Sequence, residues 1–528
     1  MSAPVLGIDL GTTNSVVASI DGDGRVVILR NADGAEITPS VVYFEPGGGV
    51  VVGEEARRAT AVDPGNGVRL IKRHMGEDFP LVFQDQDHTP ESISALILRQ
   101  LTAAAPAASG VRARAVITVP AYFGLAEREA TYQAGVIAGL DVLELLDEPV
   151  AAAAHYGLTS GGSRTVLVYD LGGGTFDTTV LRVADGAVTV LATDGHHSLG
   201  GADVDQRLLD LVLARLEPLL PRSQFDDLVD DRRLLGSLAL DVEAAKQDLS
   251  TRTSRDLTVL TAGGRVKVTI SRADLEAACG DLFDTTAEII ERVLDAAARP
   301  GAAAARPAPP VDEVIMVGGS SRIPSLSARL TGLLGVAPRL VEPDLAVAKG
   351  AALRAHQLLA TPQLTALSRS AGRRGAAAGQ VTPVTPRAVG ILIEDSNDPS
   401  GERSFVEHLV QANTPLPVTR TEERFGTILA GQDSVRIQVF EQAGAAPSEE
   451  VAHNRRVMDG ELTKIGSLPA GSVIKITVKI AIDGRLTVIA HEPVTGRELT
   501  LEAFVEGVVD SAETERLTKL VGMTALRG

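Results

Sequence analysis

The chain has 528 residues, of which 44% are hydrophobic, 3% are aromatic and none is tryptophan, and its formal net charge at pH 7 is −18. This composition predicts a water-soluble protein of two to four domains with an aliphatic core, and the negative charge argues against binding to nucleic acids. No apolar run reaches the ~20 residues of a membrane span and no secretory signal precedes the first strand pattern, so we expect a cytoplasmic protein that does not bind membranes. The single cysteine, Cys279, excludes an internal disulfide framework and a cysteine-based zinc site.

Residues 1–360 alternate between short β-branched segments and segments rich in Ala, Leu and Glu. The expected strands include "VITVP" (116–120), "TVLVYDL" (165–171) and "EVIMVGG" (313–319), and the expected helices include residues 91–101, 126–140 and 205–216. This alternation predicts an α/β architecture.

The pattern changes twice in the remaining third of the chain. Residues 361–387 are rich in Ala, Gly, Pro, Ser and Thr without a sustained period, which predicts a flexible linker. Residues 388–507 show the short alternating stretches of an all-β sandwich, with "IDGR" (482–485) as a hairpin turn. Residues 508–528 predict one short C-terminal helix, with Asp510 and Glu513 spaced as a capping box.

An internal repeat links two parts of the α/β region. "GIDLGTTNSVV" (7–17) and "YDLGGGTFDTTV" (169–180) share Asp-Leu-Gly followed by small residues and threonine. A duplicated strand-turn-strand unit predicts two similar lobes that face one another.

The glycines of this repeat suggest anion binding, because a turn without side chains lets backbone N–H groups approach a phosphate. Asp9, Asp170 and Asp177 would repel phosphate unless a divalent cation lies between them, and Mg²⁺ prefers such oxygen ligands. The repeat therefore predicts a Mg²⁺-nucleotide site, with threonine hydroxyls beside it. The alternative is a pair of glycine-rich β-hairpins with exposed acids.

Two further segments fit the same site, each with an ordinary alternative. "VIMVGGSSRIP" (314–324) predicts a buried strand, a Gly-Gly turn and a helix start, which either binds an anion or is a common α/β turn. "DVEAAKQDLS" (241–250) predicts a helix with Glu243, Lys246 and Ser250 on one face. This face either holds a ribose and adenine or is a solvated charged surface.

The ordered motifs together resemble the DnaK-type 70-kDa heat-shock chaperone family of the actin-like ATPase superfamily, over residues 4 to 510. The motifs that carry the resemblance are "GIDLGTTNS", "IKRHMG", "VITVPAYF", "LLDEPVAAAAHYGL", "VYDLGGGTFD", "HSLGGADVD", "AKQDLS", "VGGSSRIP" and "EPDLAVAKGAA". The resemblance implies a two-lobed actin-like ATPase domain with a duplicated ribonuclease-H-like fold, followed by a β-sandwich and the short helix.

The resemblance also implies a role for individual residues. The cofactors would be ATP or ADP and Mg²⁺, with K⁺ as a further candidate ion, and Asp9 and Asp170 would hold Mg²⁺ through waters. Lys72 would contact the γ-phosphate, Glu148 and Asp177 would orient or deprotonate the attacking water, and Thr175 would complete the catalytic set. The remaining nucleotide-binding residues would be Gly11, Thr12, Thr13, Asn14, Gly172, Gly173, Gly174, Gly200, Gly201, Glu243, Lys246, Ser250, Gly318, Gly319, Ser320, Arg322 and Asp344.

Two more features follow from the same resemblance. Pro120 and Arg128 match the family's relay between the ATP site and the linker. Phe425, Val435 and Ile437 lie where the family lines its peptide pocket, and the alternation places Val435 and Ile437 on one strand face. These three side chains could equally belong to an ordinary sandwich core.

The chain departs from the family at three points. "AAGQVTPVTP" replaces the acidic, leucine-rich linker, Glu144 replaces a basic residue that helps bind the J-domain cochaperone, and the helical lid over the peptide site is missing. We therefore expect an ATP-hydrolysing, lidless chaperone that binds unfolded or extended polypeptides, is dedicated to one client or complex, and has its own cochaperone or nucleotide exchange factor. The alternatives are a non-cycling ATP-gated scaffold and a small-molecule kinase of the actin-like superfamily.

Overall fold

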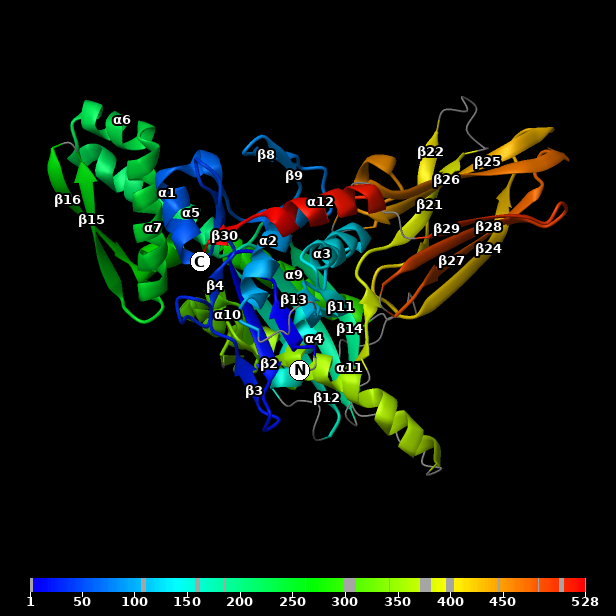
Figure 1. The fold of residues 1–528 in the computed structure, drawn as a ribbon, viewed down its shortest axis with the longest axis horizontal. Coiled ribbons are helices and arrows are strands. Elements are labelled where there is room, and N and C mark those ends of the chain that lie inside the picture. Colours follow the sequence, from blue (N-terminus) through cyan, green and yellow to red (C-terminus); the bar gives the residue numbers. More distant parts are fainter. Residues whose placement is uncertain are drawn as a thin grey trace.

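The computed structural model describes the chain except residues 1–2, 106–110, 157–161, 185–186, 262, 299–309, 341, 371–380, 396–402, 445–446, 483, 503–507 and 528. The α/β region contains two lobes, each built on one sheet (Figure 1). The first sheet has the order β11-β10-β1-β2-β3 and comprises β1 (Val5–Asp9), β2 (Asn14–Ile20), β3 (Val26–Ile28), β10 (Arg114–Val119) and β11 (Asp141–Asp147), with β4 (Thr38–Pro39) beside β2.

The second sheet repeats the arrangement of the first. Its order is β18-β17-β12-β13-β14-β19, and its strands are β12 (Arg164–Leu171), β13 (Phe176–Ala184), β14 (Ala187–His196), β17 (Glu313–Val317), β18 (Arg339–Leu340) and β19 (Val381–Thr382). In both sheets an antiparallel hairpin, β1–β2 or β12–β13, lies beside a parallel strand. The duplicated lobes predicted from the repeat are confirmed.

Two alanine-rich helices, α4 (Glu148–His155) and α11 (Ala346–Ser370), pack between the sheets. Small side chains allow this close packing, since a Cβ added at Gly350 would lie 1.8 Å from the carbonyl oxygen of Ala151. Other helices cover the lobes: α2 (Pro90–Thr102), α3 (Leu125–Ile137), α5 (Gly201–Leu216), α8 (Arg272–Ala278), α9 (Gly280–Ala297) and α10 (Pro324–Leu334).

Each lobe carries an extension, and the two extensions contact one another. The first contains β5 (Val42–Phe44), β6 (Val50–Val52), α1 (Glu54–Val62), β7 (Gly67–Val68), β8 (Leu81–Phe83) and β9 (Gln86–His88). The second contains α6 (Arg222–Asp230), α7 (Arg232–Leu249), β15 (Ser254–Thr261) and β16 (Gly264–Ser271). Helix α1 packs directly on α7, and this contact joins the two lobes.

The all-β module is a sandwich of two four-stranded sheets (Figure 1). One sheet contains β21 (Val389–Glu394), β22 (Ser404–Val410), β25 (Gln432–Gln442) and β26 (Asn454–Leu468). The other contains β24 (Val418–Gly426), β27 (Val473–Ile480), β28 (Leu486–Glu492) and β29 (Arg497–Glu502). The predicted hairpin joins β27 and β28, although Asp483 of its turn lies outside the described residues.

At both of its described ends, the segment expected to be a flexible linker (361–387) forms secondary structure instead. Helix α11 continues to Ser370, and residues 371–380 lie outside the described part of the chain. Beyond them, β19 pairs in parallel with β14 of the second lobe, and β20 (Val384–Thr385) pairs with β23 (Thr414–Pro415) of the β module. Two-residue strands bound by distant partners leave no periodicity in a sequence.

The predicted C-terminal helix exists as α12 (Ser511–Met523), but its cap is only half of a capping box. Asp510 Oδ1 accepts a hydrogen bond from Glu513 N at 2.8 Å, whereas the Glu513 carboxylate pairs with Arg516. Helix α12 packs on α2 and α3, and β30 (Leu526–Arg527) then pairs with β6. The C-terminal segment thus lies along the first lobe, where α12 appears as a red helix (Figure 1).

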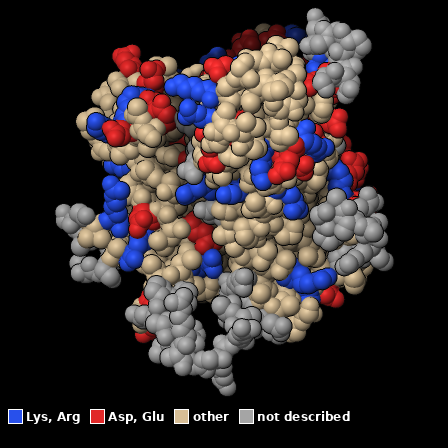
Figure 2. Space-filling view, turned by 90° about the vertical axis from the view of Figure 1, so that its right-hand side faces the viewer, with Lys and Arg blue, Asp and Glu red and all other residues tan. Residues whose placement is uncertain are grey.

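Charge on the face that carries the sandwich is mixed. Lysine and arginine side chains alternate there with aspartate and glutamate, over a surface that is otherwise mostly uncharged (Figure 2). Within the described residues, no helix is both long and apolar enough to span a bilayer.

Candidate functional site

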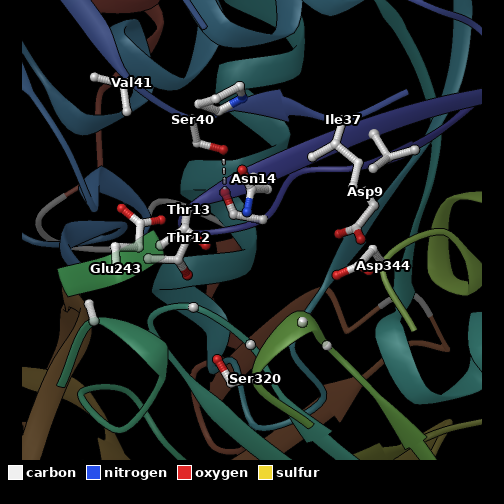
Figure 3. A pocket seen from close by; sticks show the side chains of 18 of the residues that line it. Asp9, Thr12, Thr13, Asn14, Ile37, Ser40, Val41, Glu243, Ser320 and Asp344 are labelled. Carbon is white, nitrogen blue, oxygen red and sulfur yellow. Dashed lines mark hydrogen bonds between the residues drawn. The ribbon is translucent and has the colours of Figure 1, made fainter. Parts of the chain in front are cut away.

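A cavity of about 980 Å³ lies between the two lobes, and most of the predicted nucleotide-binding residues line it. Figure 3 shows the first turn and Glu243 on one side and Ser320 on the other. The predicted residues among its lining are Asp9, Gly11, Thr12, Thr13, Asn14, Lys72, Glu148, Asp170, Gly172, Gly173, Thr175, Glu243, Lys246, Ser250, Gly318, Gly319, Ser320, Arg322 and Asp344. Four predicted residues are not in the lining but lie next to it: Gly174, Gly200, Gly201 and Asp177. The three glycines approach lining residues closely, and Asp177 is the cross-strand partner of Asp170.

The two repeated turns approach each other at the base of the cavity. A Cβ added at Gly173 would lie 1.8 Å from Thr13 Oγ1, and one added at Gly174 would lie 2.2 Å from Thr12 Cγ2. The second turn must therefore be glycine because the threonines of the first turn occupy the adjacent space. This arrangement excludes the alternative of two separate glycine-rich hairpins with exposed acids.

The cavity base is rich in buried carboxylates. Asp170, Asp177 and Glu148 are buried, and Glu148 Oε1 accepts a hydrogen bond from Lys72 Nζ at 2.7 Å. Burial, followed by the nearby Glu148 charge, raises the pKa of Asp9 to about 7 and raises the pKa values of Asp170 and Asp177 well above the usual range. The single positive charge of Lys72 cannot balance the negative charges of these carboxylates.

This donor set fits a bound magnesium ion. Carboxylate oxygens are the ligands that Mg²⁺ prefers, and a cation would offset the burial of these negative charges and the repulsion between them, which together raise these pKa values. Within the described residues, no three His, Cys, Asp or Glu side chains gather closely enough to ligate one metal directly. The expectation that Asp9 and Asp170 hold Mg²⁺ through waters stays a prediction.

Asp177 occupies a different place from the other acids. Its Oδ2 accepts a hydrogen bond from Ala121 N at 2.5 Å, and Thr193 Oγ1 donates to its Oδ1 at 3.4 Å. The Asp177 side chain therefore connects the cavity base to the segment before α3. The predicted relay residue Pro120 lies in this segment and accepts a backbone hydrogen bond from Phe123. The other relay residue, Arg128, lies in the first turn of α3, and its Nη2 is 2.5 Å from Asp147 Oδ1.

Helix α7 closes the opposite end of the cavity with charged residues. Lys246 Nζ donates to Gly201 O at 2.9 Å and pairs with Asp205 at 2.8 Å. Glu243 pairs with Arg57 of α1 at 2.9 Å, so this ion pair crosses between the lobes. Glu243 and Lys246 thus line the cavity, and their role toward a nucleotide stays a prediction. Arg57 and Asp205 were missed, because single charges on amphipathic helices carry no local signal.

The segment 314–324 also faces the cavity. It forms β17, the Gly318–Gly319 turn and the start of α10 (Pro324–Leu334). Arg322 of this turn forms an ion pair with Asp344, whose carboxylate lies near that of Asp9 (Figure 3). The turn is therefore part of the cavity wall rather than a remote α/β connection.

The proposed peptide pocket is part of the sandwich interior. Ile437 is buried in the core, and Phe425 and Val435 are partly buried and pack against it. Near Phe425 in the chain, the apolar side chains of Ile428 and Leu429 are 49% and 68% exposed. An ordinary sandwich core therefore explains the contacts of Phe425, Val435 and Ile437, and their role toward peptides stays a prediction.

Glu144, which replaces the family's basic residue, lies on β11 and is paired. Its carboxylate accepts from Arg354 Nε at 3.0 Å and lies 2.9 Å from Arg354 Nη2. Both side chains are about one-fifth exposed, at 21% and 22%. Arg354 thus fixes the position of the Glu144 carboxylate, which remains partly exposed.

Comparison with known proteins agrees with this geometry. The family model described as "Hsp70 protein" matches residues 5–89 and 80–525. The chain is 37% identical to the chaperone protein DnaK of Thermotoga neapolitana over 94% of this chain and 80% of that protein. It is likewise 37% identical to DnaK of Thermotoga maritima, over 97% of this chain and 82% of that protein.

Proposed function

The chain belongs to the Hsp70 family, whose two-lobed actin-like ATPase domain and β-sandwich it has, and from this premise we propose that it is an ATP-hydrolysing chaperone. The ATPase domain binds ATP or ADP in the cavity between the lobes and hydrolyses ATP to ADP and phosphate. The sandwich binds extended segments of unfolded polypeptides. The single observation that carries this proposal is a large cleft with two touching glycine turns and more buried carboxylates than cations.

The residues of the cleft have distinct tasks in phosphoryl transfer to water, where positioning and charge neutralisation dominate. Asp9 and Asp170 would hold Mg²⁺, which when bound neutralises phosphate charge. Lys72 directs its ammonium group into the cavity because Glu148 holds it at 2.7 Å. Glu148, at the first position of α4, orients the water and accepts its proton. Backbone N–H groups of the two glycine turns and the Thr175 hydroxyl bind the phosphate oxygens.

Asp177 supports this arrangement from behind the cavity. It accepts the amide of Ala121 and hydrogen-bonds with Thr193, and its charge acts on Glu148 through their shared low-dielectric surroundings. We therefore assign Asp177 to the orientation of Glu148 and the water, rather than to contact with the phosphates.

The finer features of the proposed chaperone are a peptide site that α12 does not cover and a dedicated client. The helix that follows the sandwich, α12, packs on α2 and α3 of the ATPase domain, with Leu517 and Val521 buried there. This helix would then not cover a peptide bound to the sandwich. The paired Glu144 supports a dedicated cochaperone or exchange factor in place of a general J-domain protein.

Product analysis tests the proposal. The purified full chain is incubated with ATP and Mg²⁺, and released phosphate is measured against Lys72→Ala. Mg²⁺-dependent phosphate release that this substitution abolishes supports an ATPase. ATP binding without any product would favour the non-cycling scaffold, and transfer of phosphate to an added metabolite would favour the kinase.

A further inference from the structure

The segment that joins α11 to the sandwich is held by both domains. On one side, Val381 and Thr382 pair with Val188 and Thr189 of β14. On the other side, Asn413 N donates to Thr385 O at 2.7 Å, and Gln442 N donates to Ala388 O at 2.9 Å. The joining segment therefore connects a sheet edge of the ATPase domain with strand β25 of the sandwich.

Arg387 in this segment lies between two carboxylates that come from different domains. Its Nη2 is 3.0 Å from Glu127 Oε1 of α3, and its Nη1 is 3.7 Å from Glu441 Oε2 of β25. The three side chains are 20%, 15% and 1% exposed, respectively. We call Arg387, Glu127 and Glu441 the junction triad.

Glu441 is the most buried member of the junction triad and also contacts the ATPase domain directly. Its Oε1 accepts a hydrogen bond from Leu125 N at 3.0 Å, which satisfies a free amide in the first turn of α3. Its Oε2 and Glu127 Oε2 accept no hydrogen bond among the described residues. Without Arg387, two buried carboxylates would face each other across the domain contact.

We propose that Arg387 holds the sandwich against the ATPase domain by neutralising Glu127 and Glu441, and thereby fixes the two domains to each other in place of the leucine-rich linker that this chain lacks. The inference deepens the proposed function, because it names how the peptide-binding domain is connected to the ATP site. Breaking a buried ion pair by removing one partner is strongly unfavourable, whereas replacing all members with neutral groups is often tolerated.

The junction triad lies close to the catalytic carboxylates. Tyr122 is buried between the two clusters, and its pKa is raised by burial and by the charges of Asp177, Glu148 and Glu127. The neighbouring Ala121 amide is the hydrogen-bond donor to Asp177. A shift of residues 121–127 would therefore move the Ala121 amide and disturb its hydrogen bond to Asp177.

Hydrogen–deuterium exchange can test the proposal, since two amides report on the domain contact. Leu125 N donates to Glu441, and Thr193 N donates to Asn413 Oδ1 of the sandwich at 2.9 Å. The variants are Arg387→Met and a triple variant that adds Glu127→Gln and Glu441→Gln. The matched control is Arg436→Met, which removes an exposed arginine paired with Asp459 within the sandwich.

We expect Arg387→Met to accelerate exchange at both amides by on the order of a hundredfold. The control should keep the parent rate. The triple variant should return to the parent rate, because the side-chain amide that Glu441→Gln introduces still has a carbonyl oxygen to accept from Leu125 N. Parent-like exchange in Arg387→Met would overturn the proposal, and so would a triple variant in which both amides are unprotected. The triple variant decides the matter even if Arg387→Met does not fold.

The exchange is measured in a non-hydrolysable ATP analogue, so no turnover is required. Absence of ATPase activity would refute the proposed function but would not affect the exchange result. Conversely, parent-like exchange in Arg387→Met would refute the role of the junction triad but would not affect the proposed ATPase activity.

Discussion

The ATP cleft and the domain junction both bury more carboxylates than cations, but they differ in the space around those charges. In the cleft, Asp170, Asp177 and Glu148 share Lys72 beside a cavity of about 980 Å³. At the junction, Glu127 and Glu441 share Arg387 beside a cavity of about 200 Å³. The first cluster has room for a charged ligand, and the second is packed between protein surfaces.

This difference shows which buried charges serve chemistry and which serve conformation. Uncompensated charge beside a large cavity is best balanced by something that binds, such as a cation with a nucleotide. An uncompensated charge inside a domain contact is balanced by a guanidinium group or by a bound proton. The stability of that contact then depends on the guanidinium group and on the pH. Each of the following experiments alters one of these two clusters or the connection between them.

The largest effect is expected in the cleft. Lys72→Ala should lower Mg²⁺-dependent ATP hydrolysis by about a hundredfold to a thousandfold, because positioned charge at the phosphoryl group contributes roughly 3–4 kcal/mol to the barrier. Asp177→Asn should lower it by a similar factor, because Asp177 orients Glu148 and the attacking water. Asparagine keeps the acceptor for Ala121 N, so the Asp177 substitution removes mainly charge. Steady-state phosphate release gives the rate, and nucleotide binding is measured separately.

Lys267→Ala is the matched control for Lys72, since Lys267 is 65% exposed and pairs with Asp256 on β15. It should hydrolyse ATP at the parent rate. If Lys72→Ala and Asp177→Asn also do so, the assignment of these residues to catalysis is wrong.

The cleft was largely predictable from the sequence, and the junction was not. The turns of the cleft consist of contiguous residues whose chemistry is local: glycines that leave the backbone bare, and acids that require a cation. Two copies of this pattern, at Asp9 and Asp170, were sufficient to predict facing lobes. The alternation of the sandwich strands was equally local, as the burial of β27 shows.

The junction depends on residues that are far apart in the chain. Glu127, Arg387 and Glu441 each appear as an ordinary charge in the sequence, and only the fold brings them together. For the same reason the docking of β19 on β14, and of α12 on α2 and α3, could not be predicted. Pairing between distant short segments leaves no period in the sequence.

The next effect concerns the pH dependence of the junction. Burial raises the pKa of Glu441 from 4.5 to about 7, although Arg387 opposes this rise. The groups that face Glu441 are Arg387, Glu127 on α3, Arg455 on β26 and the amide of Leu125. If the Glu441 carboxyl group titrates at its ordinary pKa when the domains separate, the docked state binds more protons between these values.

The proton linkage therefore favours docking most below about pH 4.5, and this contribution is lost as the pH rises through about 7. Between pH 6 and pH 8, protection of the Leu125 amide, corrected for intrinsic exchange, should fall about tenfold. Glu441→Gln removes the titrating group and should abolish this dependence. A parent protein whose corrected protection is the same at both pH values would contradict the assignment.

A smaller effect is expected for peptide release from the sandwich. Leucine-rich extended peptides should bind weakly and dissociate fast, because α12 lies on the ATPase domain and affinity differences appear mainly in the off-rate. Since internal charges hold the junction, ATP should change the off-rate by less than about fivefold, below most allosteric couplings. Stopped-flow release of a labelled peptide, with ATP and with ADP, measures both quantities.

Two outcomes would change this interpretation. Release over many minutes in ADP that ATP sharply accelerates would reveal a trap and strong coupling. No binding at all would favour the scaffold, with Phe425, Val435 and Ile437 as plain sandwich core. Val435→Asp provides the comparison variant, because it places a charge at the partly buried position of the proposed pocket.

The smallest effect is expected from a general J-domain. Such a domain should stimulate hydrolysis by at most about twofold, because Glu144 would repel its basic helix and single surface charge contacts contribute little. The double substitution Glu144→Arg with Arg354→Glu keeps the ion pair but reverses its direction, so that a basic group occupies position 144. If Glu144 is the obstacle, the reversed pair should be stimulated several-fold more than the parent at physiological salt. Single-turnover hydrolysis with and without the J-domain gives the comparison. Robust stimulation of the parent would show that the negative charge is no barrier, and equal, low stimulation of both proteins would place the obstacle at the joining segment and its junction triad instead.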